Sequence, residues 1–253
     1  MKITFLGTGT SQGVPVIGCD CKVCLSADQR DNRLRTSIMI EVNGTCIVVD
    51  TGPDFRQQML RENVQHLDAV VFTHEHKDHL AGLDDVRAFN YKTKKAIDVY
   101  GSKQVHEAIK RDFHYVFHSN KYPGVPELNL FEIREEHFKI KNITLTPIEV
   151  WHHMMKVKAF RINDFTYITD ANKIENSEME KIRGSKILVI NALRRESHIS
   201  HFTLQQALTI IKELNPETAY LIHLSHQMGL HEDLLKELPN NIFPAYDGLQ
   251  ISC

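Results

Sequence analysis

The sequence predicts an α+β protein in which two β-sheets are covered by helices. Nine short runs rich in β-branched and aromatic residues recur along the 253 residues. They follow one another in series, interrupted by amphipathic helical patterns, and do not alternate strictly with helices. This order favours two packed sheets over one doubly wound sheet.

The predicted strands begin with the run KITFL and end with the run AYLIHL. Each is a short apolar segment of ordinary strand length. In chain order they cover residues 2–6, 37–42, 45–50, 69–73, 143–150, 158–162, 165–169, 186–191 and 219–224.

The predicted helices carry start and stop signals. The first opens at Pro53, because Pro is favoured in a first turn, and it places Phe55, Met59 and Leu60 on one face. Gly184 ends a later helix. The remaining helical patterns cover residues 102–113, 176–184, 203–214 and 230–238.

A Pro-rich segment, SNKYPGVPELNL at residues 119–130, is a predicted loop. It is long enough to shape a site but too short to separate domains. The chain contains no internal repeat and no linker-like stretch. We therefore expect residues 1–253 to form a single domain.

Charge and hydropathy exclude several classes of partner. The net charge of −2 gives no overall attraction to nucleic acid or to an anionic membrane. No apolar run approaches the roughly 20 residues of a membrane span, and the first residues lack the apolar region of a signal peptide. We expect a cytoplasmic protein with a small-molecule partner. These features do not determine the oligomeric state, and a homodimer is one option.

The stretch VVFTHEHKDHLAG, residues 70–82, carries the strongest chemical signal. His74, His76, Asp78 and His79 follow directly after an apolar strand. Imidazole nitrogen and carboxylate oxygen are the ligands that borderline divalent metals prefer. Four such residues within a hexapeptide favour a metal site over a solvated turn.

Further candidate ligands stand near the ends of later predicted strands: His152 and His153, Asp170, and His223 and His226. A lone His at a strand end more often has a structural role. Six or seven ligands together, however, could hold two cations about 3.5–4 Å apart, as in two-metal hydrolysis. A carboxylate such as Asp170 could bridge the cations, because each of its oxygens can bind one of them.

These motifs resemble, in order, those of the metallo-β-lactamase superfamily. H-x-H-x-D-H after an apolar strand, a later His, a Thr-Asp pair and a final His occur together with FLGTGTS near the N-terminus and VVDTG at residues 48–52. The resemblance runs from Lys2 to about His226. It implies an αββα sandwich of two mixed sheets flanked by helices, with a dinuclear site along one edge.

The resemblance also implies the role of each ligand. The register of PIEV before His152 and FRI after it selects His152 and not His153. One cation would be bound by His74, His76 and His152, the other by Asp78, His79 and His223, and Asp170 would bridge them. Zinc, manganese, iron or nickel would suit such ligands, and availability decides among these metals.

The run GCDCKVC gives a second cluster, formed by Cys19, Cys21 and Cys24. In a chain without a secretory signal, this C-x-C-x-x-C spacing favours metal over disulfides. Three thiolates around zinc leave one tetrahedral position to fill. A redox-active thiol cluster is the alternative interpretation.

The fourth ligand of this cluster is less evident from spacing. Cys46 lies within a predicted strand and is typical of a small core residue, and Cys253 is terminal. His226 is the better candidate, because it stands in a loop three residues after His223. We therefore predict a structural zinc bound by the three thiols and His226.

The Cys cluster and the HLSH motif at residues 223–226 resemble those of the phosphoribosyl cyclic phosphodiesterases of the carbon–phosphorus lyase pathway. In that group the thiols and the last His hold a structural zinc, while a two-metal site hydrolyses cyclic phosphodiesters. The resemblance implies a metal-dependent phosphodiesterase for a small, cyclic, ribose-type ester, attacked by a hydroxide between two cations. Asp78 would orient the nucleophile, and His201, where that group has its general acid, would protonate the leaving oxygen.

Other functions share the same ligands. A tRNA 3′-processing endonuclease also cuts phosphodiesters, but it should carry a basic surface or arm, which this composition does not indicate. Carbonyl-ester, thioester and β-lactam hydrolysis remain open, because the same cations polarise carbonyl groups. A non-catalytic metal-binding scaffold would be indicated by a missing ligand, and here none is missing.

Overall fold

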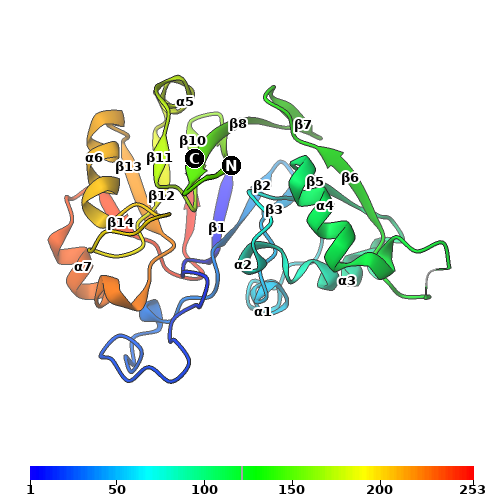
Figure 1. The fold of residues 1–253 in the computed structure, drawn as a ribbon, viewed down its shortest axis with the longest axis horizontal. Coiled ribbons are helices and arrows are strands. Elements are labelled where there is room, and N and C mark those ends of the chain that lie inside the picture. The colour runs from blue at the N-terminus through cyan, green and yellow to red at the C-terminus, as the bar shows by residue number, and fades with distance from the viewer. Residues whose placement is uncertain (121) are drawn as a thin grey trace.

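Two β-sheets pack face to face in the computed structural model, and helices cover the outer side of each sheet (Figure 1). The structure describes residues 1–120 and 122–253. Both sheets contain parallel and antiparallel strand pairs. The predicted α+β class with two mixed, helix-flanked sheets is confirmed. That residues 1–253 form a single domain stays a prediction.

The first sheet is built from the N-terminal half of the chain and one C-terminal strand. The amine of Met1 donates to the carbonyl of Cys253 over 2.6 Å, so both ends of the chain meet at its edge. Its strands lie in the order β15 (Gln250–Ser252), β1 (Lys2–Gly7), β2 (Ser37–Val42), β3 (Thr45–Val49), β4 (Ala69–Val71), β5 (Ile97–Gly101) and β6 (Leu128–Glu132).

The second sheet comes from the C-terminal half. Its strands lie in the order β11 (Lys173–Ile174), β8 (Ile143–His152), β9 (Met155–Ile162), β10 (Phe165–Ile168), β12 (Ile187–Asn191), β13 (Thr218–Ile222) and β14 (Ile242–Pro244), with β7 (Phe138–Ile140) paired to β8. The strands β10, β12, β13 and β14 run parallel to one another. Their carboxyl ends therefore lie along one edge.

The helices are short, and several begin at a capping side chain. The hydroxyl of Thr203 accepts from the backbone N–H of Gln206, whose side chain accepts in return from the N–H of Thr203. The α-helices are α1 (Phe55–Arg61), α2 (Lys77–Leu80), α3 (Arg87–Thr93), α4 (Lys103–Asp112), α5 (Asn176–Ile182), α6 (Leu204–Leu214) and α7 (His231–Glu237). The 3-10 helices are η1 (Gln29–Asp31), η2 (Leu83–Val86), η3 (His114–Val116) and η4 (His226–Met228).

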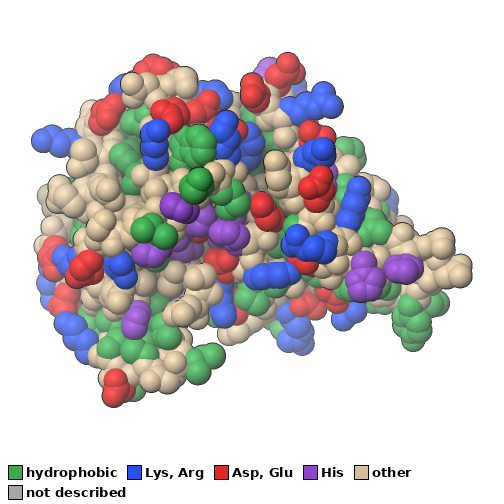
Figure 2. Space-filling model, viewed as in Figure 1, with side chains coloured by type: hydrophobic (Ala, Val, Ile, Leu, Met, Phe, Trp, Pro, Cys, Tyr) green, Lys and Arg blue, Asp and Glu red, His purple; other side chains and the backbone are tan. Residues whose placement is uncertain are grey.

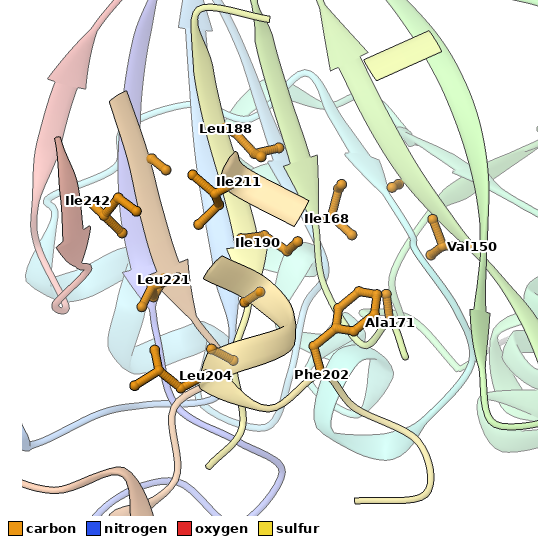
Figure 3. Packing of buried hydrophobic residues seen from close by; sticks show 14 of the residues in the cluster. Val150, Ile168, Ala171, Leu188, Ile190, Phe202, Leu204, Ile211, Leu221 and Ile242 are labelled. Atoms are coloured by element: carbon orange, nitrogen blue, oxygen red, sulfur yellow. The ribbon is translucent and has the colours of Figure 1, made fainter. Parts of the chain in front are cut away.

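Apolar clusters hold the layers together. Along β12, Leu188 and Ile190 point to the helix-covered side, whereas Val189 packs between the two sheets. Figure 3 shows Ile211 of α6 in the cluster on the helix-covered side. A further cluster joins α1, α3 and α4 to the first sheet. Burial of these apolar faces is the main stabilising term for the sandwich.

The predicted elements occur, but the patterns miss others. All nine predicted strands and all five helical patterns have counterparts in the structure. Leu60, however, is 63% exposed, so only Phe55 and Met59 of the predicted apolar face of α1 are buried. The missed elements are β5, β6, β7, β11, β14, β15, α2 and α3, which contain between two and seven residues. Such short segments give little periodicity to detect.

The Pro-rich segment 119–130 is only partly a loop. Its last residues enter β6, which begins at Leu128. Lys121 within it lies outside the described residues. No helix in the described part of the chain combines the length and apolar character that crossing a bilayer requires.

Candidate functional site

The predicted metal ligands follow strands of both sheets and meet along one edge of the sandwich. His74 and His76 follow β4, and Asp78 and His79 lie on α2, the short helix that comes next. The ligands from the second sheet stand at the ends of β8, β10 and β13, namely His152, Asp170 and His223. Figure 2 shows histidine side chains gathered near the middle of one face of the molecule.

His74, His76 and His152 form the first ligand cluster. One ligand atom from each lies within 4.8 Å of the others. The Thr73 hydroxyl donates to Asp50, so it accepts from Nδ1 of His74 over 2.9 Å. The buried Nε2 of His74 has no hydrogen-bond partner among the described residues. It is thus the atom left to bind a ligand.

The first cluster is completed from the second sheet. His152 ends β8 and donates from Nδ1 to the carbonyl of Ser200 over 2.9 Å. This bond fixes the tautomer and turns Nε2 toward His74 and His76. His153 is exposed in the turn that follows, at φ 56°, and belongs to no cluster. The structure therefore brings together the three histidines that the register selected.

Asp78, His79, Asp170 and His223 form the second cluster, again with ligand atoms within 4.8 Å of one another. Nε2 of His79 lies 3.3 Å from Asp78 and 3.2 Å from Asp170. Nε2 of His223 lies 3.1 Å from the other carboxylate oxygen of Asp170. Both Nε2 atoms are buried without a conventional hydrogen-bond partner. Buried ring nitrogens that lack a hydrogen-bond partner and converge in this way are suited to bind a cation.

Asp170 lies between the two clusters. It also groups with His152 of the first cluster and with His201. Within the second cluster, one of its oxygens lies near His79 and the other near His223. A carboxylate with this placement can contribute one oxygen to each of two cations.

Backbone conformations that are unusual for non-glycine residues recur at the site. Asp50, Asp170 and His223 have φ of 65°, 55° and 56°. Such conformations cost free energy and persist where the surrounding structure imposes them. The side chain of Asn191 bonds both the N–H and the carbonyl of Ala171, which fixes the backbone next to Asp170.

A close approach of two loops also positions α2. A Cβ at Gly52 would lie 2.1 Å from the carbonyl oxygen of Asp78. Only glycine fits there. In the VVDTG motif, backbone packing thus requires Gly52, whereas Asp50 is the acceptor for His79.

The electrostatics of the second cluster favour paired charges. Burial opposes ionisation of Asp170, but His223 and His79 outweigh it and hold the pKa of the carboxyl well below its usual value. In the same way, burial opposes protonation of His223, but Asp170 and Asp78 raise its pKa to about 9. Protons on the imidazoles therefore balance the carboxylates when no cation does. Cation binding would release these protons.

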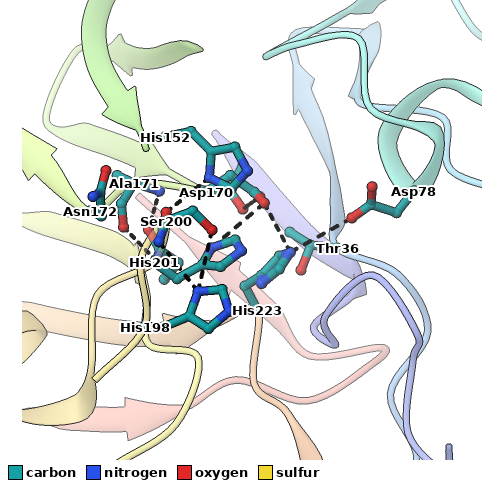
Figure 4. A network of polar contacts seen from close by, with 12 residues as sticks. Thr36, Asp78, His152, Asp170, Ala171, Asn172, His198, Ser200, His201 and His223 are labelled. Carbon is teal, nitrogen blue, oxygen red and sulfur yellow. Dashed lines mark hydrogen bonds and ion pairs between the residues drawn. The ribbon is translucent and has the colours of Figure 1, made fainter. Parts of the chain in front are cut away.

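His201 lies over the clusters on the loop that precedes α6 (Figure 4). Its ring centroid is 4.7 Å from that of His223 and 4.7 Å from that of His152. Its Nδ1 is buried without a conventional hydrogen-bond partner, 3.8 Å from Asp170. Burial and the neighbouring His223 lower its pKa to about 3. Negative charge from a bound phosphate would raise that pKa again.

The thiols of Cys19, Cys21 and Cys24 surround Nδ1 of His226. The three S···N distances are 3.2, 3.5 and 3.5 Å. Zinc with tetrahedral Cys and His ligands would place these atoms about 3.6 Å apart. None of the three forms a disulfide. The N–H of Cys24 donates to Cys21 and lowers the pKa of that thiol to about 6, which favours the thiolate.

The Cys cluster is joined to the histidine clusters through the chain. His226 opens η4, three residues after His223. Leu224, between them, donates to the carbonyl of Thr8 and accepts from the N–H of Thr10, next to the FLGTGTS turn. A metal in the Cys cluster would therefore tie the loop after β1 to the segment that carries His223. Cys46 is buried in β3, away from this cluster, as predicted.

Sequence reasoning did not assign three supporting groups. Asp50 accepts from Nδ1 of His79 over 2.8 Å and from Thr73, and the carbonyl of Ser200 accepts from His152. Asp50 belongs to the VVDTG motif, so the sequence pattern pointed to this residue but did not reveal that it supports His79. Thr73 and Ser200 have no pattern that spacing could reveal.

Three arginines that could in principle contact a phosphate, Arg35, Arg194 and Arg195, bond to protein side chains. Arg35 pairs with Asp54, and Arg195 pairs with Glu237. Arg194 donates to Gln227. These three side chains are therefore not assigned to the site.

Comparisons with known proteins agree with the fold. The family description "Beta-lactamase superfamily domain" matches residues 45–224. A crystal structure described as a new diphosphatase from the PhnP family has 36% identity and a TM-score of 0.93, with 100% of this chain and 97% of that chain covered. The short form of human tRNase Z shares the fold at 17% identity and a TM-score of 0.72, covering 100% and 99% of the two chains.

A curated relative is named octanoyltransferase, from Porphyromonas gingivalis. It is 41% identical over 253 residues, which cover 99% of this chain. The chain spans about half of the length of that relative, 51%. The family match across most of the chain and the sandwich fold together show that the chain belongs to the β-lactamase superfamily of hydrolases.

Proposed function

We propose that the protein is a metal-dependent hydrolase of a small phosphate ester, in the first place a cyclic, ribose-type phosphodiester. The observation that carries this proposal is the pair of ligand clusters with Asp170 between them. An arrangement of this kind suits two divalent cations that share one phosphate group. Zinc or manganese is our first expectation for these cations, with iron or nickel as alternatives.

Divalent cations bound here would polarise the phosphate oxygens and acidify water. The chain's own side chains then have separate tasks. Asp78 lies at the solvent side of the second cluster and is less buried than Asp170, so it is the carboxylate that can orient the attacking water. Asp50 and Thr73 hold His79 and His74 in fixed tautomers.

His201 would donate a proton to the leaving oxygen. Its ring lies beside both clusters, and its Nδ1 has no hydrogen-bond partner among the residues that the structure describes. A phosphate held against the clusters would bring the negative charge that favours its protonated form. This role makes His201 most important for leaving groups that are poor without a proton.

We further propose that the Cys cluster binds a structural zinc. Three thiols and one imidazole fill all four tetrahedral positions, so such a site has no open position for a substrate or water. The S···N distances of 3.2–3.5 Å support a metal over a redox pair, because all three sulfurs surround a single ring nitrogen. Reduced thiols of this kind suit a reducing compartment, which supports our expectation of the cytoplasm.

The similarity to a PhnP-family diphosphatase supports phosphate chemistry and adds a phosphoanhydride to the substrates to be tested. The likeness to tRNase Z, at 17% identity, extends to the fold alone. A net charge of −2 offers no general attraction to tRNA. A small-molecule substrate is therefore preferred to a nucleic acid.

A second candidate is hydrolysis of an acyl ester or thioester at the same clusters. The relative named octanoyltransferase favours it, because that name refers to acyl chemistry. The name describes a protein twice as long, of which this chain matches one half. Acyl hydrolysis is thus ranked second.

One substrate panel separates these functions. Protein loaded with zinc or manganese is incubated with bis(p-nitrophenyl) phosphate, a cyclic ribose phosphate, a dinucleoside diphosphate and an octanoyl thioester. The proposal expects phosphate-ester hydrolysis that is lost on metal removal and restored by metal. Hydrolysis of the thioester alone would favour the second candidate, and no phosphate hydrolysis with full metal loading would refute the first.

A further inference from the structure

An apolar cavity opens directly beside the first histidine cluster. It has a volume of about 410 Å³ and is lined by His76, His152, His153, Met154, Met155, Ile199 and Ser200. Two of these residues are also ligands of the proposed metal site. A cavity of this size falls within the roughly 300–1,000 Å³ of small-molecule sites. A group in this cavity would lie next to a substrate phosphate bound at the histidine clusters.

Large apolar side chains form two walls of this cavity. Met154 is 81% exposed in the turn between β8 and β9, and Ile199 is 72% exposed on the loop before α6. Exposed apolar residues are ordinary when they are scattered. Here they flank one cavity at the edge of the ligand clusters, and Figure 2 shows hydrophobic side chains beside the central histidines.

One side chain joins the two walls. Asn172 accepts from the N–H of His153, in the β8–β9 turn, and donates to the carbonyl of Ile199, both over 2.9 Å. The carbonyl of Ser200 is bonded in turn by His152. Figure 4 shows Asn172, Ser200 and His152 in this network. The spacing of the walls is therefore set before any ligand arrives.

The lining contains no Lys, Arg, Asp or Glu among the described residues. A second phosphate or a carboxylate in this cavity would have no Lys or Arg partner in its lining. The methionines, in contrast, adapt to flat or irregular apolar groups. The cavity thus favours a neutral apolar group over a charged one.

We propose that this cavity is the subsite for an apolar group of the substrate, of about the size of a phenyl ring or nucleobase, carried close to the scissile phosphate. Met154 and Ile199 contact that group, and Asn172 is a positioning residue that sets the distance between them. This inference rests on the proposed phosphate-ester hydrolysis. It narrows the substrate from any small phosphodiester to one that carries a neutral, apolar substituent.

Two esters with the same leaving group test the subsite. Phenyl p-nitrophenyl phosphate and methyl p-nitrophenyl phosphate have the same charge and release the same nitrophenolate. After correction for their uncatalysed rates, the metal-loaded protein should prefer the phenyl ester by about tenfold or more in kcat/KM, the scale on which apolar pockets discriminate. Most of the preference should appear in KM.

Substitutions then assign the preference to the cavity. The double variant M154S/I199S should bring the ratio of the two esters close to parity. N172D keeps the acceptor for His153 but cannot donate to Ile199, so the KM for the phenyl ester should rise more than that for the methyl ester. Leu60→Ser is the control, because Leu60 is also a largely exposed apolar residue, at 63%, but lies on α1. It should leave the ratio unchanged.

A binding measurement separates the subsite from the reaction. Calorimetry compares phenylphosphonate with methylphosphonate on metal-loaded parent and M154S/I199S. Tighter binding of the phenyl compound, lost in the variant, supports the subsite even without turnover. If the phenyl-to-methyl ratio is the same in M154S/I199S as in the parent, in either assay, the inference is overturned. Failure of the parent to hydrolyse both esters refutes the proposed function, and the binding result then decides the subsite.

Discussion

The pair of clusters at the sheet edge and the Cys cluster differ in their ligand atoms and in their openness. The clusters at the sheet edge combine imidazoles with carboxylates and lie beside a cavity and a further imidazole, His201. The Cys cluster combines three thiols with one imidazole and lies between two loops. The sheet-edge arrangement leaves room for a substrate, whereas the Cys cluster supplies all four ligands of a tetrahedral metal. Divalent metals at the first would act on a ligand, and zinc at the second would stabilise the fold.

The difference shows that metal chemistry follows the surroundings of the ligands and not only their number. Asp170 can serve two cations because it belongs to the second cluster and also groups with His152 of the first cluster. His226 can serve one metal only, because the three thiols surround a single ring nitrogen. The following predictions test this division, from the largest expected effect to the smallest.

Removing a ligand from the sheet-edge clusters should abolish activity. H76A and D78A should reduce phosphate-ester hydrolysis to the level of the metal-free protein, because each removes one donor from a cation. Circular dichroism should show the parent fold, and elemental analysis should show less bound metal. H66A, at an exposed histidine outside the clusters, is the control. Full activity and full metal content in H76A or D78A would contradict the assignment.

Removing His201 should separate substrates by leaving group. H201A should slow an ester with an alkoxide leaving group by about 10²-fold or more, the scale of general acid catalysis. Nitrophenyl esters should be slowed far less, because nitrophenolate leaves without a proton. The rate ratio of the two substrates within the same variant is the measurement. Equal slowing of both would exclude the acid role.

Removing the support of a ligand should have an intermediate effect. D50N weakens the acceptor for His79 and Thr73, and loss of such support typically costs about 10–100-fold in metal affinity or activity. Metal titration followed by kinetics would measure both quantities. D98N is the control, since Asp98 bonds Asn129 on the first sheet. A D50N protein with parental metal affinity and rate would show that Asp50 has only a structural role.

Removing a thiol should affect stability more than chemistry. C21S should lose about one metal equivalent and melt at a lower temperature, because the free energy of metal binding at a structural site is folding free energy. Activity should fall only as far as His223 loosens. C46S, at a buried cysteine outside the cluster, should also lower the melting temperature but should keep all the metal. An unchanged zinc content in C21S would contradict a zinc site there.

The smallest effect concerns the pH dependence of stability through His231, the first residue of α7. Burial and the neighbouring Arg33 lower the pKa of His231 to about 4, below its ordinary value of 6.5. Between these values the unfolded chain binds the proton more readily, so stability should fall as pH falls from about 6.5 to 4. H231Q keeps an acceptor for Arg33 and should make this fall less steep.

Urea midpoints of the metal-loaded parent and H231Q at pH 7 and pH 5 would measure this effect. The variant should lose less stability than the parent between the two values. The same loss in both proteins would show that His231 does not contribute to the acid limb.

Sequence reasoning performed best where one signal was repeated. Apolar runs gave the central strands, since both faces of strands such as β12 are buried and leave a clear pattern. It performed worst at the margins. Strands β11 and β14 contain two and three residues, which is too few for any period, and they form only because a neighbouring strand offers partners. The exposed Leu60 shows the same limit, because helical spacing does not reveal how much of a face is covered.

By itself, the sequence determined the kinds of donor atoms and the strands that they follow. H-x-H-x-D-H and C-x-C-x-x-C identify metal-binding chemistry, because those side chains at that spacing suit few other tasks. Only the tertiary structure decided which donors meet. His152 and His153 are adjacent in the chain, yet one faces the cluster and the other faces solvent, because the turn after β8 reverses the backbone between them. The roles of Asp50, Ser200 and Asn172 likewise depend on contacts between distant segments, which no local pattern encodes.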